Sequence, residues 1–225
     1  MARRIIGSLF ATLDGVIQGP GGPAEDTSGG FGEGGWVFKL ADDGIDQTLG
    51  SLFSRPFDLL LGRRTYDIFA AYWPYVGEED GGIGPLFTSV TKHVLSRGDF
   101  DNGWENTRAL GSMDEVAALK ETEGPDLLIQ GSGTLYPALL AAGLLDELTL
   151  MTFPVVLGNG KRWFDETVPP LSLEVTATRV TKKGTIIATY RPAAQLPPYP
   201  VDGVPQPATS EREATRQRAI ADGSW

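Results

Sequence analysis

The stretch LLLGRRTYDIFAAYWP, residues 59–74, joins an apolar run to a segment in which aromatic residues recur at helical spacing. This pattern predicts a buried strand that turns at Gly62 directly into a helix beginning near Thr65. Open α/β sheets hold their ligands at the carboxyl ends of their strands. Arg63 and Arg64 stand at such an end, so they are candidates for binding an anion such as a phosphate.

A second corner of the same kind occurs at residues 126–136, DLLIQGSGTLY. An apolar strand ends at the GSG of residues 131–133, and a helix starts at Thr134. The two glycines let the backbone approach a ligand, and free N–H groups at a helix start favour a phosphate. Taken alone, the segment fits a tight turn without a ligand equally well. Residues 94–97, VLSR, form a third, weaker corner, and the three together favour a polyphosphate site.

The remaining pattern alternates apolar strand-like runs with helical segments. Strands are predicted at residues 5–13, 57–61, 93–96, 107–110, 126–130, 147–156, 173–180 and 185–191. Helices are predicted at residues 43–54, 65–73 and 134–142, with another capped by Ser112. The last two strands flank Lys182-Lys183-Gly184 and look like an antiparallel hairpin. The sequence therefore predicts an α/β fold with a mostly parallel sheet and an antiparallel C-terminal edge.

Composition limits the classes of function. The chain has 225 residues, a formal net charge of −10, no cysteine and a single histidine, His93. The acidic balance disfavours nucleic acid and anionic membranes as partners, and the absence of cysteine argues against disulfides and zinc–thiolate sites. No apolar run approaches the roughly 20 residues of a membrane span. We expect a cytoplasmic globular protein without a metal site, in which His93 is structural.

Residues 18–36, QGPGGPAEDTSGGFGEGGW, are too rich in glycine and proline for a regular element. Residues 30–35 within them formally match G-x-G-x-x-G. That pattern has physical meaning only between a strand and a helix, and coil precedes it here. We interpret the loop either as a mobile cover over a cleft or as a surface connection.

The corner motifs GRRTY and GSGTLY, together with TLDG at residues 12–15, DEL at 146–148 and LGNGK at 157–161, resemble the dihydrofolate-reductase-like superfamily. They are similar to stand-alone relatives of the C-terminal reductase domain of the bifunctional riboflavin-biosynthesis deaminase-reductase. The resemblance covers residues 3–192 and implies an eight-stranded sheet, NADPH as hydride donor and a homodimer. It gives a domain at 1–192 and leaves 193–225 as a proline-rich tail with a possible short helix.

The resemblance also implies which residues hold the cofactor. The first corner would meet the adenosine phosphates and pyrophosphate, the second would wrap the pyrophosphate and nicotinamide side, and the third would flank the adenine and its ribose phosphate. The end of the first strand would line the nicotinamide. These cofactor residues are Gly62, Arg63, Arg64 and Thr65; Gly131, Ser132, Gly133, Thr134 and Leu135; Leu95, Ser96 and Arg97; and Phe10, Thr12 and Ile17.

Catalysis by hydride transfer needs close positioning and a proton for the neighbouring atom. By the resemblance, Asp46 occupies the place of the acid that serves the substrate, and Asp14, Asp42 and Asp43 lie close enough in sequence to compete for that role. Acids near a helix start are also commonly dipole partners only. Trp36 and Phe38 are candidates for a flat apolar wall against a heterocycle, with core packing as the alternative.

These observations predict an NADPH-dependent reductase of a small heterocyclic substrate, pterin-like or aminopyrimidine-like, or of a carbonyl compound. A riboflavin-pathway reductase, a dihydrofolate reductase proper and a reductase of a specialised metabolite remain open within the enzyme class. A non-catalytic NADPH-binding module is the alternative outside it.

Overall fold

The computed structural model describes residues 2–78, 81–164, 168, 170–196 and 210–225. The chain forms two compact units, residues 1–195 and 196–225, which are described separately. The strands are β1 Ile5–Thr12, β2 Phe57–Gly62, β3 Lys92–Leu95, β4 Thr107–Leu110, β5 Asp126–Gln130, β6 Glu147–Phe153, β7 Leu171–Val180 and β8 Ile186–Gln195. The helices are α1 Trp36–Leu40, α2 Asp43–Phe53, α3 Arg63–Ala70, α4 Ile83–Ser89, α5 Met113–Lys120, α6 Leu135–Ala141 and α7 Glu211–Asp222, with short 3-10 turns at Ser28–Gly30 and Trp73–Tyr75.

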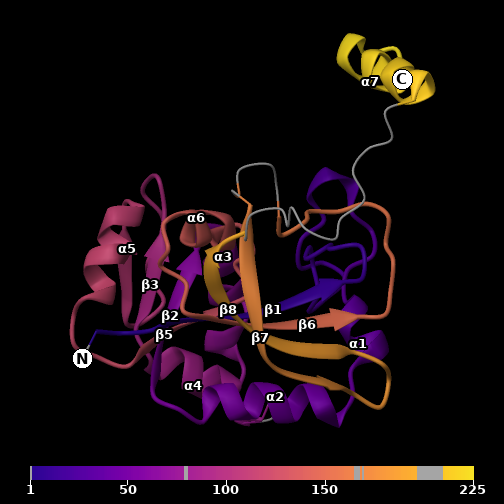
Figure 1. The fold of residues 1–225 in the computed structure, drawn as a ribbon. Coiled ribbons are helices and arrows are strands. Elements are labelled where there is room, and N and C mark those ends of the chain that lie inside the picture. Colours follow the sequence, from indigo (N-terminus) through magenta and orange to yellow (C-terminus); the bar gives the residue numbers. More distant parts are fainter. Residues whose placement is uncertain (1, 79–80, 165–167, 169, 197–209) are drawn as a thin grey trace. The chain divides into compact units, whose positions relative to one another are not determined.

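The eight strands form one sheet in the order β4-β3-β2-β5-β1-β6-β8-β7 (Figure 1). Every pairing from β4 to β6 is parallel, whereas β8 runs antiparallel to both β6 and β7. The predicted fold class is confirmed, including the antiparallel hairpin. β6 ends at Phe153 rather than at residue 156, because Pro154 has no N–H to donate to the ladder. The domain boundary was predicted at residue 192, and strand β8 continues to Gln195.

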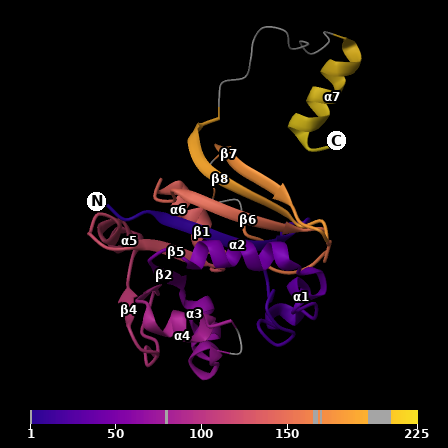
Figure 2. The same cartoon turned by 90° about the horizontal axis from the view of Figure 1, so that it is seen from below.

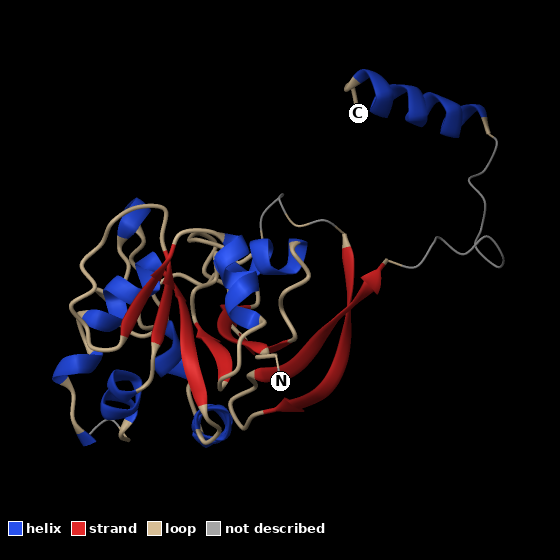
Figure 3. Ribbon diagram, turned by 90° about the vertical axis from the view of Figure 1, so that its left-hand side faces the viewer, coloured by secondary structure: helices blue, strands red, loops and turns tan. Residues whose placement is uncertain are grey.

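Helices pack on both faces of the sheet. On one face, Leu9 and Ile129 belong to one hydrophobic cluster with Leu135 and Leu139 of α6 and Val116 of α5. The opposite face carries two clusters, and α2 contributes residues to both. Figure 2 shows α2 lying along this face, and in Figure 3 the β7–β8 hairpin projects at one end of the helix-covered sheet. The first cluster includes Ile6, Leu59, Leu61, Tyr66, Phe87, Leu128, Leu52 and Phe53, and the second includes Phe10, Val16, Phe31, Trp36, Ile45, Leu49, Met151 and Phe153.

The second unit contains α7, which lies within the tail where a short helix was considered possible. Ser210 Oγ accepts a hydrogen bond from the Glu213 N–H at 3.2 Å, as an N-cap residue does. Within the described residues, no helix is both long enough and apolar enough to cross a membrane.

Candidate functional site

The two glycine-containing corners lie side by side at the carboxyl edge of the sheet. β2 and β5 are neighbouring parallel strands, so the residues that follow them come together. Gly62 donates its N–H to Ser132 Oγ at 3.0 Å, and Ser132 donates its N–H to Thr65 Oγ1 at 3.2 Å. The two motifs are therefore one hydrogen-bonded unit.

The loop after β5, residues 131–133, has glycine at two of its three positions and therefore few side chains. Gly131 has φ 72° and Ser132 has φ 48°, a left-handed conformation that a residue with a side chain holds only when its surroundings support it. The hydrogen bonds of Ser132 supply that support. A Cβ on Gly133 would lie 2.0 Å from Ile17 Cδ1. Ile17 can pack this closely against the backbone only because residue 133 is a glycine.

The two arginines of the first corner have different environments. Arg63 Nε is 2.8 Å from Asp67 Oδ1, and its guanidinium donates to the Asp99 carbonyl at 3.1 Å and stacks over Phe100. Arg64 is exposed, and it has no hydrogen bond or ion pair within the described part of the chain. Arg64 is thus the cation that is free to meet a ligand, whereas Arg63 is already neutralised by Asp67.

The third corner lies beside the first. β3 is parallel to β2, and Leu95 is paired with Gly62. Ser96 Oγ donates to the Gly98 carbonyl at 2.7 Å, and Arg97 is exposed. The carboxyl ends of β3, β2 and β5 are consecutive in the sheet, so the structure brings all three predicted corners to one edge. Thr134 is exposed there, and Leu135 is buried against Gly62.

The residues predicted for the nicotinamide side lie at the end of β1 or just after it. In the sheet, β1 is two strands away from β2. Phe10 is half-buried and packs edge-on against Phe153. Thr12 is buried, and Ile17 lies against Gly133 as described above. Ile17 thus links the end of β1 to the loop after β5.

Asp14 fastens a loop in this structure. Its carboxylate accepts hydrogen bonds from Thr12 Oγ1 at 2.6 Å and from the N–H groups of Leu157 and Gly158 at 3.3 and 2.9 Å. Arg162 adds an ion pair at 3.6 Å. The hydrogen bond from Thr12 contributes most to lowering the pKa of Asp14. The carboxylate is ionised and occupied, which suits an anchor better than a proton donor.

Asp46 lies on α2 in a different setting. Asp42 caps this helix by accepting the Gly44 N–H at 3.0 Å, and Asp46 is exposed. Helical spacing places Asp46 on the same flank as Gly50 and Phe53. The other flank contacts β7 through Thr48, which accepts a hydrogen bond from Arg179. Asp46 therefore lies on the flank of α2 that faces away from β7, and it has no ion pair within the described residues.

Trp36 and Phe38 do not form one wall. Trp36 is 1% exposed and packs at 5.3 Å against the Phe153 ring, which is the core-packing alternative. Phe38 is 71% exposed. The two residues differ because Trp36 opens α1, where it faces the sheet, and a residue two positions later in a helix points about 200° away.

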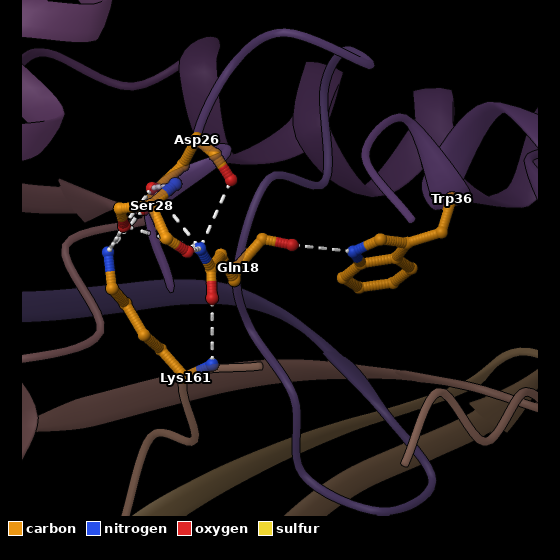
Figure 4. Close-up of polar contacts among 5 residues, drawn as sticks. All are labelled: Gln18, Asp26, Ser28, Trp36 and Lys161. Atoms are coloured by element: carbon orange, nitrogen blue, oxygen red, sulfur yellow. Dashed lines mark hydrogen bonds and ion pairs between the residues drawn. The ribbon is translucent and has the colours of Figure 1, made fainter. Parts of the chain in front are cut away.

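The glycine-rich loop is tied down by four residues, which we term the loop latch: Gln18, Asp26, Ser28 and Lys161 (Figure 4). Lys161 Nζ lies 2.6 Å from both Asp26 Oδ2 and Ser28 Oγ. Gln18 donates to the Ser28 carbonyl at 2.9 Å and accepts the Lys161 N–H at 3.0 Å. Its own carbonyl accepts from Trp36 Nε1 at 2.9 Å. The loop is therefore fastened over the second cluster, beside the end of β1.

Replacing Lys161, which supplies the positive charge of the loop latch, should free the loop. Burial raises the pKa of Asp26, but hydrogen bonds from Lys161 and Ser28 outweigh it and bring the pKa to about 2. Because the folded pKa lies below the ordinary 3.8, the latch stabilises the loop above that pH and is lost as pH falls toward 2. Lys161→Met should speed proteolysis within residues 19–35 about 5- to 30-fold at neutral pH, as expected for a loss of about 1–2 kcal/mol.

Lys39→Met is the matched control for this experiment, because Lys39 pairs with Glu33 at 3.9 Å through two exposed side chains. Exposed pairs contribute little, so its cleavage rate should equal that of the wild type. Equal rates for both variants would show that the latch does not hold the loop.

Two groups of residues in this part of the structure were not predicted from the sequence. Gln18 and Lys161 meet across 143 positions of sequence, and no local pattern signals such a contact. Ser8 and Gln130 interrupt apolar strands. A polar residue in the middle of a buried run was the available signal, and both turn out to be buried.

The strand order and the joined corners at the ends of β2 and β5 define a protein of the dihydrofolate-reductase-like fold with a reductase-like architecture. The chain also matches the RibD C-terminal domain over residues 3–187, and it belongs to that family. It is 30% identical over 193 residues to YyaP, an uncharacterized protein of Bacillus subtilis (strain 168), with 84% of this chain and 94% of YyaP covered.

Solved structures agree with this assignment. A Shewanella sp. PV-4 protein assigned to riboflavin biosynthesis matches with a TM-score of 0.63 and 25% identity, over 86% of this chain and 99% of that one. Dihydrofolate reductase from Enterococcus faecalis, solved in complex with NADP(H), matches with a TM-score of 0.52 over 85% of this chain and 99% of its own. Its identity of 17% establishes a shared fold alone.

Proposed function

We propose that this protein is a reductase that transfers a hydride from NADPH to a small heterocyclic or carbonyl substrate, and that it acts as a homodimer. The observation that carries the proposal is the joined corner of Gly62, Thr65 and Ser132, where a glycine-containing turn lies next to the unpaired Arg64. A backbone of this kind suits a pyrophosphate. A guanidinium at its side suits the extra phosphate that distinguishes NADPH from NADH.

The residues present fit such a cofactor along the whole carboxyl edge. The corner of Gly62–Thr65 and the loop of 131–133 would hold the phosphates, Ser96 and Arg97 would lie at the adenosine end, and Ile17 would meet the nicotinamide. When bound, NADPH supplies the hydride. The protein's part is to orient its ring and to exclude water, and Asp46 on the open flank of α2 would deliver a proton to the substrate.

Separate titrations of NADPH and NADH, followed by tryptophan fluorescence, test the proposal. We expect micromolar binding of NADPH and at least about tenfold weaker binding of NADH, which corresponds to about 1.4 kcal/mol. Arg64→Ala should remove most of that preference, and Arg63→Ala with Arg64→Ala should abolish NADPH binding. Arg63→Ala alone should do less than Arg64→Ala, because Arg63 already pairs with Asp67.

Arg55→Ala is the matched control, since Arg55 is an exposed arginine just before the opposite end of β2. It should bind NADPH like the wild type. If neither nucleotide binds the wild-type protein, the reductase proposal is wrong. If NADPH binds, its oxidation with dihydrofolate, aminopyrimidines and carbonyl compounds separates an enzyme from a binding module.

A further inference from the structure

Two asparagines of this chain are each followed by a glycine. Such a pair is chemically labile, because the backbone nitrogen of the glycine can attack the side-chain amide of the asparagine without hindrance from a side chain of its own. The chain has three asparagines, and Asn102 and Asn159 are the two that precede a glycine. Both residues are exposed. Because the two sites share this sequence and this exposure, a difference between them comes from the structure around them.

The backbone nitrogen that would react is bound at one site and free at the other. Gly103 donates its N–H to Asp101 Oδ1 at 2.9 Å. The N–H of Gly160 and the side chain of Asn159 have no hydrogen bond within the described part of the chain. Attack requires the nitrogen to lose its proton, and a hydrogen bond to a carboxylate holds that proton in place. The fold therefore leaves Asn159 as the more reactive site.

Asn159 stands between two fixed points of the chain. On one side, Gly158 donates its N–H to the Asp14 carboxylate at 2.9 Å. On the other side, Lys161 of the loop latch donates its N–H to Gln18 at 3.0 Å (Figure 4). Only Asn159 and the glycine after it join these two points, so the chain has little slack between them.

The backbone at Gly160 is also tightly packed. A Cβ there would lie 2.7 Å from Val16 Cγ1 and 3.0 Å from Phe31 Cε2, and the φ of this residue is 116°. An additional backbone atom next to it has no room unless Val16 or Phe31 moves, and both belong to the cluster that the glycine-rich loop covers. A longer backbone at Asn159 would therefore displace the loop and break the latch contacts.

We propose that Asn159 is a self-modification site, whose deamidation to isoaspartate releases the loop latch. The Gly160 nitrogen forms a bond to Asn159 Cγ, the carboxamide C–N bond breaks, and ammonia leaves with the backbone proton. Water then opens the succinimide ring to aspartate or, with one more carbon in the backbone, to isoaspartate. Water is the only co-reactant. The proposal does not depend on the reductase function, but it bears on the same loop, because Ile17 donates its N–H to the Lys161 carbonyl at 2.8 Å.

The first test compares the two sites within one sample. The folded protein is incubated at mildly alkaline pH, which favours loss of the backbone proton, and peptide mass spectrometry measures the acid form at each asparagine. Deamidation should be about 3- to 10-fold faster at Asn159 than at Asn102, the effect of one hydrogen bond on a rate. In denaturant the two rates should converge, because both asparagines are then followed by an unrestrained glycine. Equal rates in the folded protein, or a faster rate at Asn102, would overturn the proposal.

The second test measures the consequence for the loop. Deamidated protein is separated by anion exchange, and its proteolysis within residues 19–35 should be about 5- to 30-fold faster than that of fresh protein, as for Lys161→Met. Asn159→Gln is the matched control, because glutamine would have to form a larger and less favourable ring. After the same incubation, its loop should be cut at the wild-type rate.

Asn159→Asp separates the new charge from the longer backbone, because it adds the carboxylate and leaves the backbone length unchanged. Its loop should be cut at close to the wild-type rate. Cleavage as fast as in the deamidated protein would refute the role of isoaspartate. An unchanged cleavage rate in the deamidated protein itself would refute release of the loop latch.

Discussion

Gly133→Val is expected to weaken NADPH binding at least about 100-fold while the sheet stays folded. A Cβ at this position would already lie 2.0 Å from Ile17 Cδ1. A valine must therefore push Ile17 aside and place two more methyl groups over the loop of 131–133. The backbone could then no longer approach a pyrophosphate, and Ile17 would leave the place where it is expected to meet the nicotinamide.

The clash involves the end of a flexible side chain, so the cost to stability should be limited to about 1–3 kcal/mol, the usual range for overpacking. Isothermal titration measures the NADPH affinity, and far-UV circular dichroism checks the fold. Gly32→Ala is the control, because Gly32 has no atom within 4 Å of its Cβ position and no positive φ. It should bind NADPH normally. Normal affinity of folded Gly133→Val would exclude this loop as the cofactor cradle.

The fold could be predicted because its signals are local. The run before Gly62 and the helical spacing after it are contained in 16 residues, and both corners follow the same rule. Parallel strands place their carboxyl ends at one edge, so the gathering of the three corners also followed from the pattern. What the sequence could not supply was the pairing between the corners, because the hydrogen bond from Gly62 to Ser132 spans 70 positions.

The roles of individual side chains were harder to predict from the sequence than the fold. Two neighbouring arginines look alike in a sequence, and Asp67 is within helical reach of both, at i+4 from Arg63 and i+3 from Arg64. In the structure Asp67 pairs with Arg63, which leaves Arg64 free. Trp36 was a candidate for contact with a ligand as well as for core packing, because the loop before it has no periodicity from which burial can be inferred. The hydrogen bond from Gly158 to Asp14 spans 144 positions. No local pattern in either segment predicts it.

The two candidate acids should therefore respond to mutation in different ways. Asp46→Asn is expected to lower turnover about 10²- to 10⁴-fold, the range for a general acid, and to leave both NADPH affinity and unfolding temperature unchanged. The reason is that Asp46 is exposed and has no ion pair among the described residues. Oxidation of NADPH with the best substrate from the screen measures this effect, and Asp114→Asn, another exposed acid near a helix start, is the control.

Asp14→Ala should do the reverse. It removes a carboxylate that accepts one hydroxyl and two backbone N–H groups, so about 1.5–3 kcal/mol of stability should be lost, or about 3–12 °C in unfolding temperature. The pKa of Asp14 is lowered in the folded protein. Its stabilisation is therefore complete above the ordinary pKa of 3.8 and disappears as pH falls below it. The variant should lose less stability than the wild type on acidification, and differential scanning calorimetry across that range measures the difference. A large loss of turnover in Asp14→Ala at unchanged unfolding temperature would reverse the two assignments and make Asp14 the proton donor.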